Sequence, residues 1–174
     1  MSATTQTIEA RGGYLHAEVD PDSLIRLHKE ELDTLFEALD PIAEGQLRGA
    51  LAGKLLAVVG LDTLPEPVRG VLHLVANSAV SPWKGKYFEG DSGSNLWMGL
   101  ELGRRFGHFK VSHAPSMQGR GEVLLFNYDV PENPAPLRAI RGEARALGPG
   151  LYLARMNYLS GSGHSTLLYF TLES

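Results

Sequence analysis

The sequence predicts a mainly β fold of the α+β class, an antiparallel β-barrel preceded by two short helices. Apolar residues follow helical spacing in the N-terminal part, and from about residue 95 the apolar period changes to two. The 174 residues, 43% apolar and 21% charged, suit one domain with a core of useful size. We therefore expect a single domain over residues 1–174, with a flexible start at 1–13, a helical part at 20–80 and barrel strands at 81–174.

The first predicted helix runs from Asp20 to about residue 40. Asp20 is a suitable N-cap and Pro21 fits the first turn. Residues 18–44 carry nine acidic side chains against two basic ones, which is typical of a solvated helix face but leaves a docking surface for a partner open. The apolar positions at helical spacing are Leu24, Leu27, Leu32, Leu35, Phe36 and Leu39.

The segment that follows is less clearly patterned. Residues 45–60 mix Gly, Ala and Leu, so helix and strand compete for residues 51–59. After the break at Pro65-Glu66-Pro67, a second short helix is expected before Pro82. The residues on one face of that helix are Val68, Val71, Leu72, Val75 and Ala79.

Short segments with strand-like alternation occupy the rest of the chain. Leu96, Met98, Leu100 and Leu102 alternate with mixed residues, and Gly161-Ser162-Gly163 is typical of a hairpin loop. Successive short strands separated by turns favour a meander, and nearby glycines suit the corners of a small barrel. Further strands are expected at residues 109–113, 122–130, 138–147, 151–159 and 165–172.

Composition and charge exclude several classes of function. The net charge of -4 and the lack of a basic run argue against nucleic-acid binding. Without cysteine there is neither a disulfide framework nor a thiolate zinc site, and the six histidines have no metal-binding spacing. The N-terminal residues lack signal-peptide character, and no apolar stretch is long enough for a membrane span. We expect a cytoplasmic protein without a cofactor, and a homodimer is left open.

Residues 82–88 combine two aromatic residues with two lysines just after a turn. Trp83 could cover one wall of an apolar cavity, while the ammonium group of Lys84 or Lys86 meets an anionic or carbonyl group at its rim. The alternative is a tryptophan that closes the barrel beside two solvated lysines, and the sequence does not separate the two.

Two later groups are further candidates. Arg141, Glu143 and Arg145 alternate on one face of a predicted strand, as an outward charge ladder or as an inward anion site with Glu143 as partner. Tyr128-Asp129 ends a predicted strand, where Asp129 either caps the turn or acts as a general base. The sequence has no phosphate loop, nucleophile elbow or zinc-protease motif.

Several of these stretches resemble a group of bacterial proteins of unassigned function that carry a Gly-x-Trp-x-Gly motif. The matches cover about two-thirds of the chain in the same order, although Leu51 stands where the group's motif has tryptophan. The resemblance implies a lipocalin-like or fatty-acid-binding-like barrel and assigns no catalytic residue. The matching residues are Gly85-Lys86-Tyr87-Phe88, Tyr128-Asp129-Val130-Pro131-Glu132-Asn133-Pro134, Arg138 and Leu168-Tyr169-Phe170-Thr171-Leu172-Glu173.

These observations predict a β-barrel that encloses a small apolar molecule with an anionic or carbonyl handle. The alternatives are a cofactor-independent isomerase or cyclase for a polyketide-like or terpenoid substrate, and a scaffold that docks a protein partner. The expected ligand-binding residues are Trp83, Lys86, Trp97, Phe126, Arg141, Tyr152 and Tyr169. The residues expected to be catalytic in an enzyme are Tyr128, Asp129, Glu143 and Tyr158.

Overall fold

The computed structural model describes residues 20–58, 83–97, 105–161 and 163–174. The predicted helix between Pro67 and Pro82, the flexible start and the part of the predicted strand after Trp97 lie outside these residues. The described strands are β1 Asp40–Pro41, β2 Gly49–Val58, β3 Trp83–Glu89, β4 Ser92–Trp97, β5 Arg105–Pro115, β6 Glu122–Asn127, β7 Ile140–Gly148, β8 Leu151–Ser160 and β9 Gly163–Glu173. The described helices are α1 Pro21–Leu24, α2 Lys29–Ala38 and α4 Ala135–Arg138.

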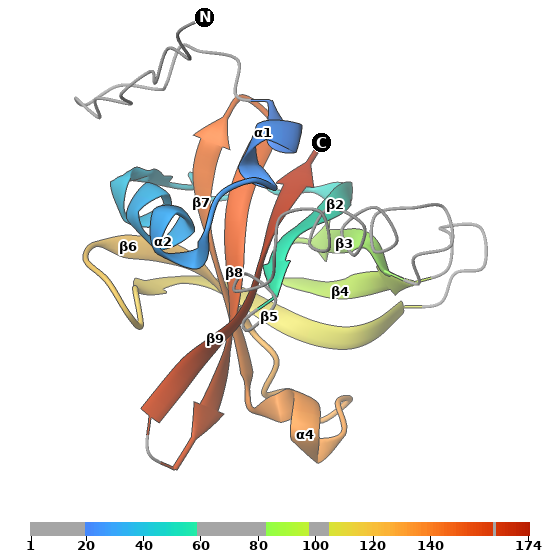
Figure 1. Cartoon of the computed structure of the whole chain (residues 1–174). Helices are drawn as coiled ribbons and strands as arrows, with labels where there is room; N and C mark the ends of the chain where they lie inside the picture. The colour runs from blue at the N-terminus through green and yellow to red at the C-terminus, as the bar shows by residue number, and fades with distance from the viewer. Residues whose placement is uncertain (1–19, 59–82, 98–104, 162) are drawn as a thin grey trace, which may run out of the picture.

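The strands form one antiparallel sheet that closes on itself (Figure 1). Its order is β1-β7-β6-β5-β4-β3-β2-β9-β8, and the additional pairing of β7 with β8 joins the two ends of the sheet. Strands β2 to β9 therefore make an eight-stranded barrel. The two residues of β1 pair with the same edge of β7 as β6 does, next to the residues with which β6 pairs. This closure confirms the predicted antiparallel barrel with short helices near the N-terminus. None of the helices that the structure describes has the length and apolar character of a membrane span.

The predicted first helix forms as two pieces. Asp20 caps α1 as expected, since its Oδ1 accepts the backbone N–H of Asp22 at 2.9 Å. The chain then breaks and restarts at His28, whose backbone N–H donates to Glu31 Oε2 at 2.7 Å. Residues 49–58, whose conformation the sequence left undecided, form strand β2 between β3 and β9.

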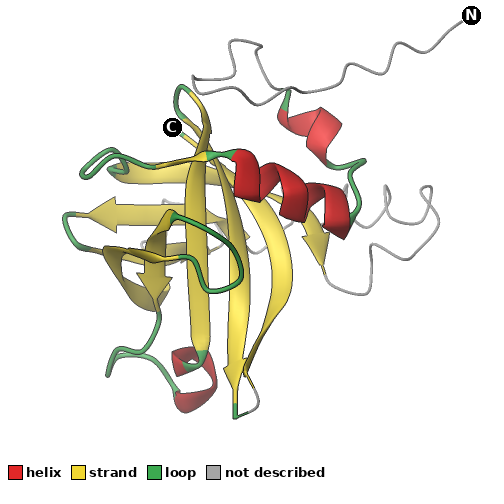
Figure 2. Ribbon diagram, turned by 90° about the vertical axis from the view of Figure 1, so that its left-hand side faces the viewer, coloured by secondary structure: helices red, strands yellow, loops and turns green. Residues whose placement is uncertain are grey.

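The barrel wall separates two apolar clusters. The inner cluster fills the barrel and includes Leu51, Phe88, Phe126 and Phe170. The outer cluster lies between the barrel wall and α2, which crosses the outside of the sheet (Figure 2). Phe36 of α2 is fully buried there. Alternation along β2, β6, β7, β8 and β9 sends side chains to both clusters, whereas the outer faces of β3, β4 and β5 do not belong to the outer cluster.

Glycines allow two close approaches in β3 and β4. Gly85 has φ of 137° beside a register shift of β3 against β4, and a Cβ there would lie 2.0 Å from the carbonyl oxygen of Leu51. Gly93 faces the interior under the ring of Phe109, which would lie 2.4 Å from an added Cβ. A side chain at either position would displace the strand or the ring that packs on it.

A buried charge network joins the outer face of the barrel to α2. Glu143 is fully buried and accepts a hydrogen bond from Arg155 Nε at 2.7 Å, and Arg155 is itself 1% exposed. Arg145 donates to the carbonyl oxygens of Phe36 and Glu37 at 2.9 and 3.1 Å. Because α2 has no basic residue in its last turn, Arg145 of β7 supplies the positive charge that its C-terminus favours.

Acidic side chains of α2 thus bind other parts of the fold. Asp33 accepts the hydroxyl of Tyr169, and Glu37 lies 3.2 Å from Arg155 NH2 and accepts the backbone N–H of Arg120 at 2.9 Å. Of the two arrangements left open for Arg141, Glu143 and Arg145, the outward one is observed, but α2 and the turn at 116–121 cover Glu143 and Arg145. The ladder is therefore a buried network rather than a solvated one.

We predict that Arg155→Met lowers the free energy of unfolding by about 3–5 kcal/mol, because Glu143 then stays buried without its main cationic partner. Urea denaturation at pH 7 measures the loss. Arg138→Met is the matched control, since the ion pair of Arg138 with Asp129 is about half exposed on both sides and should contribute less than about 1 kcal/mol. Equal losses in the two variants would contradict a structural role specific to the buried pair.

Candidate functional site

Lys86 lies inside the barrel. Alternation along β3 directs Lys86 and Phe88 inward, and only 1% of Lys86 is exposed. Its Nζ donates to Asn95 Oδ1 at 2.6 Å and to the Tyr128 hydroxyl at 2.5 Å. Asn95 is the direct partner of Lys86 on β4, whereas Tyr128 reaches it from the end of β6. Three polar side chains from separate parts of the chain thus meet at one amine.

Aromatic rings surround this polar group. Four ring centroids lie between 5.0 and 5.7 Å from Lys86 Nζ, which is within the range of cation–π attraction. Phe109 and Phe126 pack on each other at 5.2 Å, and Phe109 packs on Tyr128 at the same distance. The four rings belong to Phe109, Phe126, Tyr128 and Phe170.

Burial sets the charge of this group. Desolvation lowers the pKa of Lys86 to about 7 and raises the pKa of the Tyr128 hydroxyl, whose hydrogen bond with Asn95 opposes the rise. The one buried carboxylate of the described residues, Glu143, lies on the outer face of the wall with Arg155. Lys86 therefore exchanges between its charged and neutral forms near neutral pH.

Both forms of the amine can be satisfied by the same neighbours. A charged Lys86 donates hydrogen bonds to Asn95 and to the hydroxyl of Tyr128. The Tyr128 hydroxyl then donates its own hydrogen bond to Asn95 Oδ1, which lies 3.2 Å away. A neutral Lys86 still donates a hydrogen bond to Asn95, while its lone pair accepts a hydrogen bond from the Tyr128 hydroxyl. Tyr128 can thus change from acceptor to donor without a movement of heavy atoms.

A buried asparagine fixes the turn that carries Tyr128. Asn133 is 5% exposed, and its Oδ1 accepts the backbone N–H of His108 at 2.9 Å. Its amide donates to the carbonyl oxygens of His108 and Tyr128 at 2.6 and 2.7 Å. These bonds tie the chain after β6 to β5 and hold the Tyr128 ring over the interior.

Some of the residues expected to bind a ligand surround Lys86. Phe126 and Tyr152 belong to the inner cluster, and the half-buried Trp83 packs against it, with its ring edge-on to Phe170 at 5.3 Å. Trp97 is half-buried and donates its indole N–H to the carbonyl oxygen of Phe106 at 3.1 Å. The structure thus places Phe126 beside Lys86, and Trp83 and Tyr152 in contact with the same inner cluster.

Two of the expected ligand-binding residues lie elsewhere. Tyr169 belongs to the outer cluster under α2, where its hydroxyl donates to Asp33. Arg141 is also directed away from the interior, with its guanidinium 3.9 Å from Asp129 Oδ2. Neither lies on the interior wall where the sequence analysis expected it.

Of the residues expected to be catalytic, Tyr128 alone is part of the Lys86 group. Asp129 accepts Arg138 Nε at 2.7 Å near the surface, and Glu143 is held by Arg155. Tyr158 of β8 is 40% exposed. The sequence analysis did not identify Asn95, Phe109 or Phe170, because their meeting with Lys86 depends on a strand register that no local pattern reveals.

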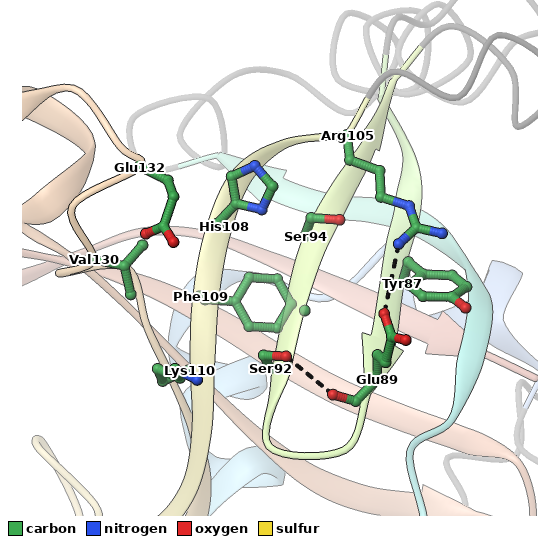
Figure 3. A pocket seen from close by; sticks show the side chains of 11 residues that line it. Tyr87, Glu89, Ser92, Ser94, Arg105, His108, Phe109, Lys110, Val130 and Glu132 are labelled. Atoms are coloured by element: carbon green, nitrogen blue, oxygen red, sulfur yellow. Dashed lines mark hydrogen bonds and ion pairs between the residues drawn. The ribbon is translucent and has the colours of Figure 1, made fainter.

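A shallow depression lies on the opposite face of the same strands (Figure 3). It holds about 230 Å³ over β3, β4 and β5. The guanidinium of Arg105 stacks 3.7 Å from the ring centroid of Tyr87 and lies 3.8 Å from Glu89 Oε2. His108, Lys110 and Glu132 also line it, so its charge is mixed.

Within the described part of the chain, no group of three or more His, Cys, Asp or Glu residues could hold a metal ion.

Comparison with known proteins informs the fold alone. No family model and no curated protein matches the sequence. Among solved structures, a crystal structure of a protein from Thermomonospora curvata is similar, with a TM-score of 0.52 and 14% sequence identity over 84% of this chain and 87% of that chain. At this identity the similarity supports the barrel architecture and carries no function.

We predict that the stability of the protein rises by about 3 kcal/mol between pH 7 and about pH 9.5 because of Lys86. The pKa of Lys86 is about 7 in the folded protein against 10.5 for a solvated lysine, so the unfolded chain binds more protons in this window and folding becomes more favourable as pH rises. Urea denaturation across this range measures the slope.

Lys86→Met should remove this contribution, whereas Lys110→Met, on the exposed outer face of β5, should retain it. The same pH slope in wild type and Lys86→Met would show that another group is responsible.

Proposed function

We propose that this β-barrel binds a small, mainly apolar molecule whose carbonyl or anionic handle meets Lys86. The observation that carries the proposal is a lysine amine enclosed by four aromatic rings, with a tyrosine hydroxyl and an asparagine amide as its polar neighbours. Apolar walls with a few convergent polar groups are typical of small-molecule sites. Trp83, Phe126 and Tyr152 would line the apolar part of the site.

The chemistry of Lys86 fits both kinds of handle. A carbonyl oxygen can accept a hydrogen bond from the amine or from Tyr128, and a carboxylate would favour the charged form of the amine. An unpaired ammonium in an apolar interior is unfavourable, so a ligand that supplies an acceptor or a negative charge would relieve that cost. A purely structural role offers no such reason for placing a lysine there.

The resemblance to Gly-x-Trp-x-Gly proteins is in keeping with this proposal. Lys86 and Tyr128 stand in the two motifs that carry it, Gly85–Phe88 and Tyr128–Pro134. We propose on this basis that the chain is a distant member of that group, and that the lysine and the tyrosine of the two motifs act together.

A second candidate is a cofactor-independent isomerase or cyclase. It is favoured by the 2.5 Å contact between Lys86 Nζ and the Tyr128 hydroxyl, since the two can exchange roles as proton donor and acceptor. A polyketide-like or terpenoid substrate would be oriented by the aromatic rings. A docking role for the acidic helix is not proposed, because Asp33 and Glu37 of α2 are already bound within the fold.

The binding proposal predicts a preference for molecules with a polar handle. We expect undecanoic acid and 2-undecanone to bind at least about threefold more tightly than undecane, given the usual contribution of one hydrogen bond. Equilibrium dialysis measures the affinities, and a shift in tryptophan fluorescence reports on Trp83 together with Trp97. Lys86→Met should abolish the preference, and Lys110→Met should keep it.

Native mass spectrometry of freshly purified protein would in addition reveal a retained molecule. Absence of binding by all three compounds, together with absence of a retained molecule, would refute the binding proposal.

The enzymatic candidate predicts a separation of turnover from binding. With a retained molecule as substrate, Tyr128→Phe should lower the rate of product formation by about 100-fold while the affinity changes by less than about tenfold. Liquid chromatography with mass spectrometry follows the product. A retained molecule that stays unchanged in the presence of wild-type protein would argue for binding alone.

A further inference from the structure

The surroundings of Lys86 suit a reaction as well as a hydrogen bond. A lysine attacks a carbonyl carbon only as the neutral amine, which is scarce for a solvated lysine at neutral pH. Desolvation by the surrounding barrel lowers the pKa of Lys86 to about 7, so the neutral amine is well populated. Lys86 therefore has the properties of a nucleophile that apolar surroundings activate.

Tyr128 and Asn95 complete the set of groups that the reaction needs. The Tyr128 hydroxyl lies 2.5 Å from Nζ, close enough to give a proton to an oxygen that forms beside the amine and to take one back. Burial raises the pKa of Tyr128, so it stays protonated and can donate. Asn95 Oδ1 accepts an N–H of Lys86 at 2.6 Å and thereby orients the amine.

We propose that Lys86 forms a covalent imine with an apolar aldehyde bound inside the barrel. The proposal rests on the proposed function, since it names the chemical class of the ligand at the same site. The nitrogen lone pair attacks the carbonyl carbon, a C–N bond forms, and the carbonyl oxygen takes a proton from Tyr128. The nitrogen then returns a proton to Tyr128, which passes it to the new hydroxyl group; this group leaves as water as the C=N double bond forms, and the nitrogen gives its second proton back to Tyr128. One water is released, and no oxidant or reductant is consumed.

The walls of the site select for a flat, apolar aldehyde. Phe109, Phe126 and Phe170 offer ring faces and edges that pack on a conjugated or aromatic molecule. The aldehyde must displace side chains, because Lys86 is 1% exposed. The half-buried Trp83 meets Phe170 edge-on, and the Phe170 centroid lies 5.3 Å from Lys86 Nζ, so these two rings are the ones that an entering aldehyde would have to displace.

The test uses 2-naphthaldehyde as the probe, with full-length protein at pH 7. Sodium cyanoborohydride reduces an imine to a stable secondary amine, and intact mass spectrometry with peptide mapping locates it. We expect one predominant adduct, on Lys86. Lys110→Met should give the same adduct, whereas Tyr128→Phe should form it at least about tenfold more slowly because a proton donor is lost. Adducts spread over exposed lysines, and unchanged in Lys86→Met, would overturn the proposal.

A ketone of similar shape distinguishes imine formation from non-covalent binding at the same site. Equilibrium dialysis with 2-acetylnaphthalene measures binding without requiring an imine. Binding of the ketone that Lys86→Met weakens, without an aldehyde adduct on Lys86, would refute the imine and leave the binding function standing. Failure of both probes to bind would refute the two together.

Discussion

Closure of the sheet is the constraint on which the other features depend. β7 pairs with β6 along one edge and with β8 along the other, so the sheet has an inside and an outside. Because side chains alternate along each strand, every strand supplies one set of residues to the interior, and β2, β6, β7, β8 and β9 also supply residues to the layer under α2. Two buried polar groups among the described residues, one around Lys86 and one around Glu143, arise from this division.

The two groups differ in how their charge is compensated. Glu143 meets Arg155 at 2.7 Å and also accepts a backbone N–H from the turn after β5, so its burial is offset by a charged partner and hydrogen bonds. Lys86 has hydrogen bonds and ring faces, but no buried carboxylate of the described residues lies on its side of the wall, and burial accounts for its lowered pKa. The outer group stabilises the attachment of α2, whereas the inner group places a reactive amine at a cost in stability.

Local patterns in the sequence predicted the barrel, but only part of the site. Alternation and turn signals indicated most of the strands, and the capping signal of Asp20 was sufficient to place the start of α1. Lys86 and Tyr128 were each singled out, yet 42 positions separate them, and their contact depends on how β3 to β6 align. Register shifts at Trp83/Gly85 and Ser94/Asn95 make that alignment unreadable from apolar spacing alone.

The same limit explains the misplaced ligand residues. Tyr169 and Phe170 are adjacent in β9, so one must face the barrel interior and the other α2, and composition does not say which. The structure assigns Phe170 to the ring of aromatic residues around Lys86 and Tyr169 to Asp33 of α2. Each neighbour thereby supports one of the two buried groups. A change in the register of β9 would place the Tyr169 hydroxyl inside the barrel and leave Asp33 without it, so the interior amine and the attachment of the helix depend on one alignment.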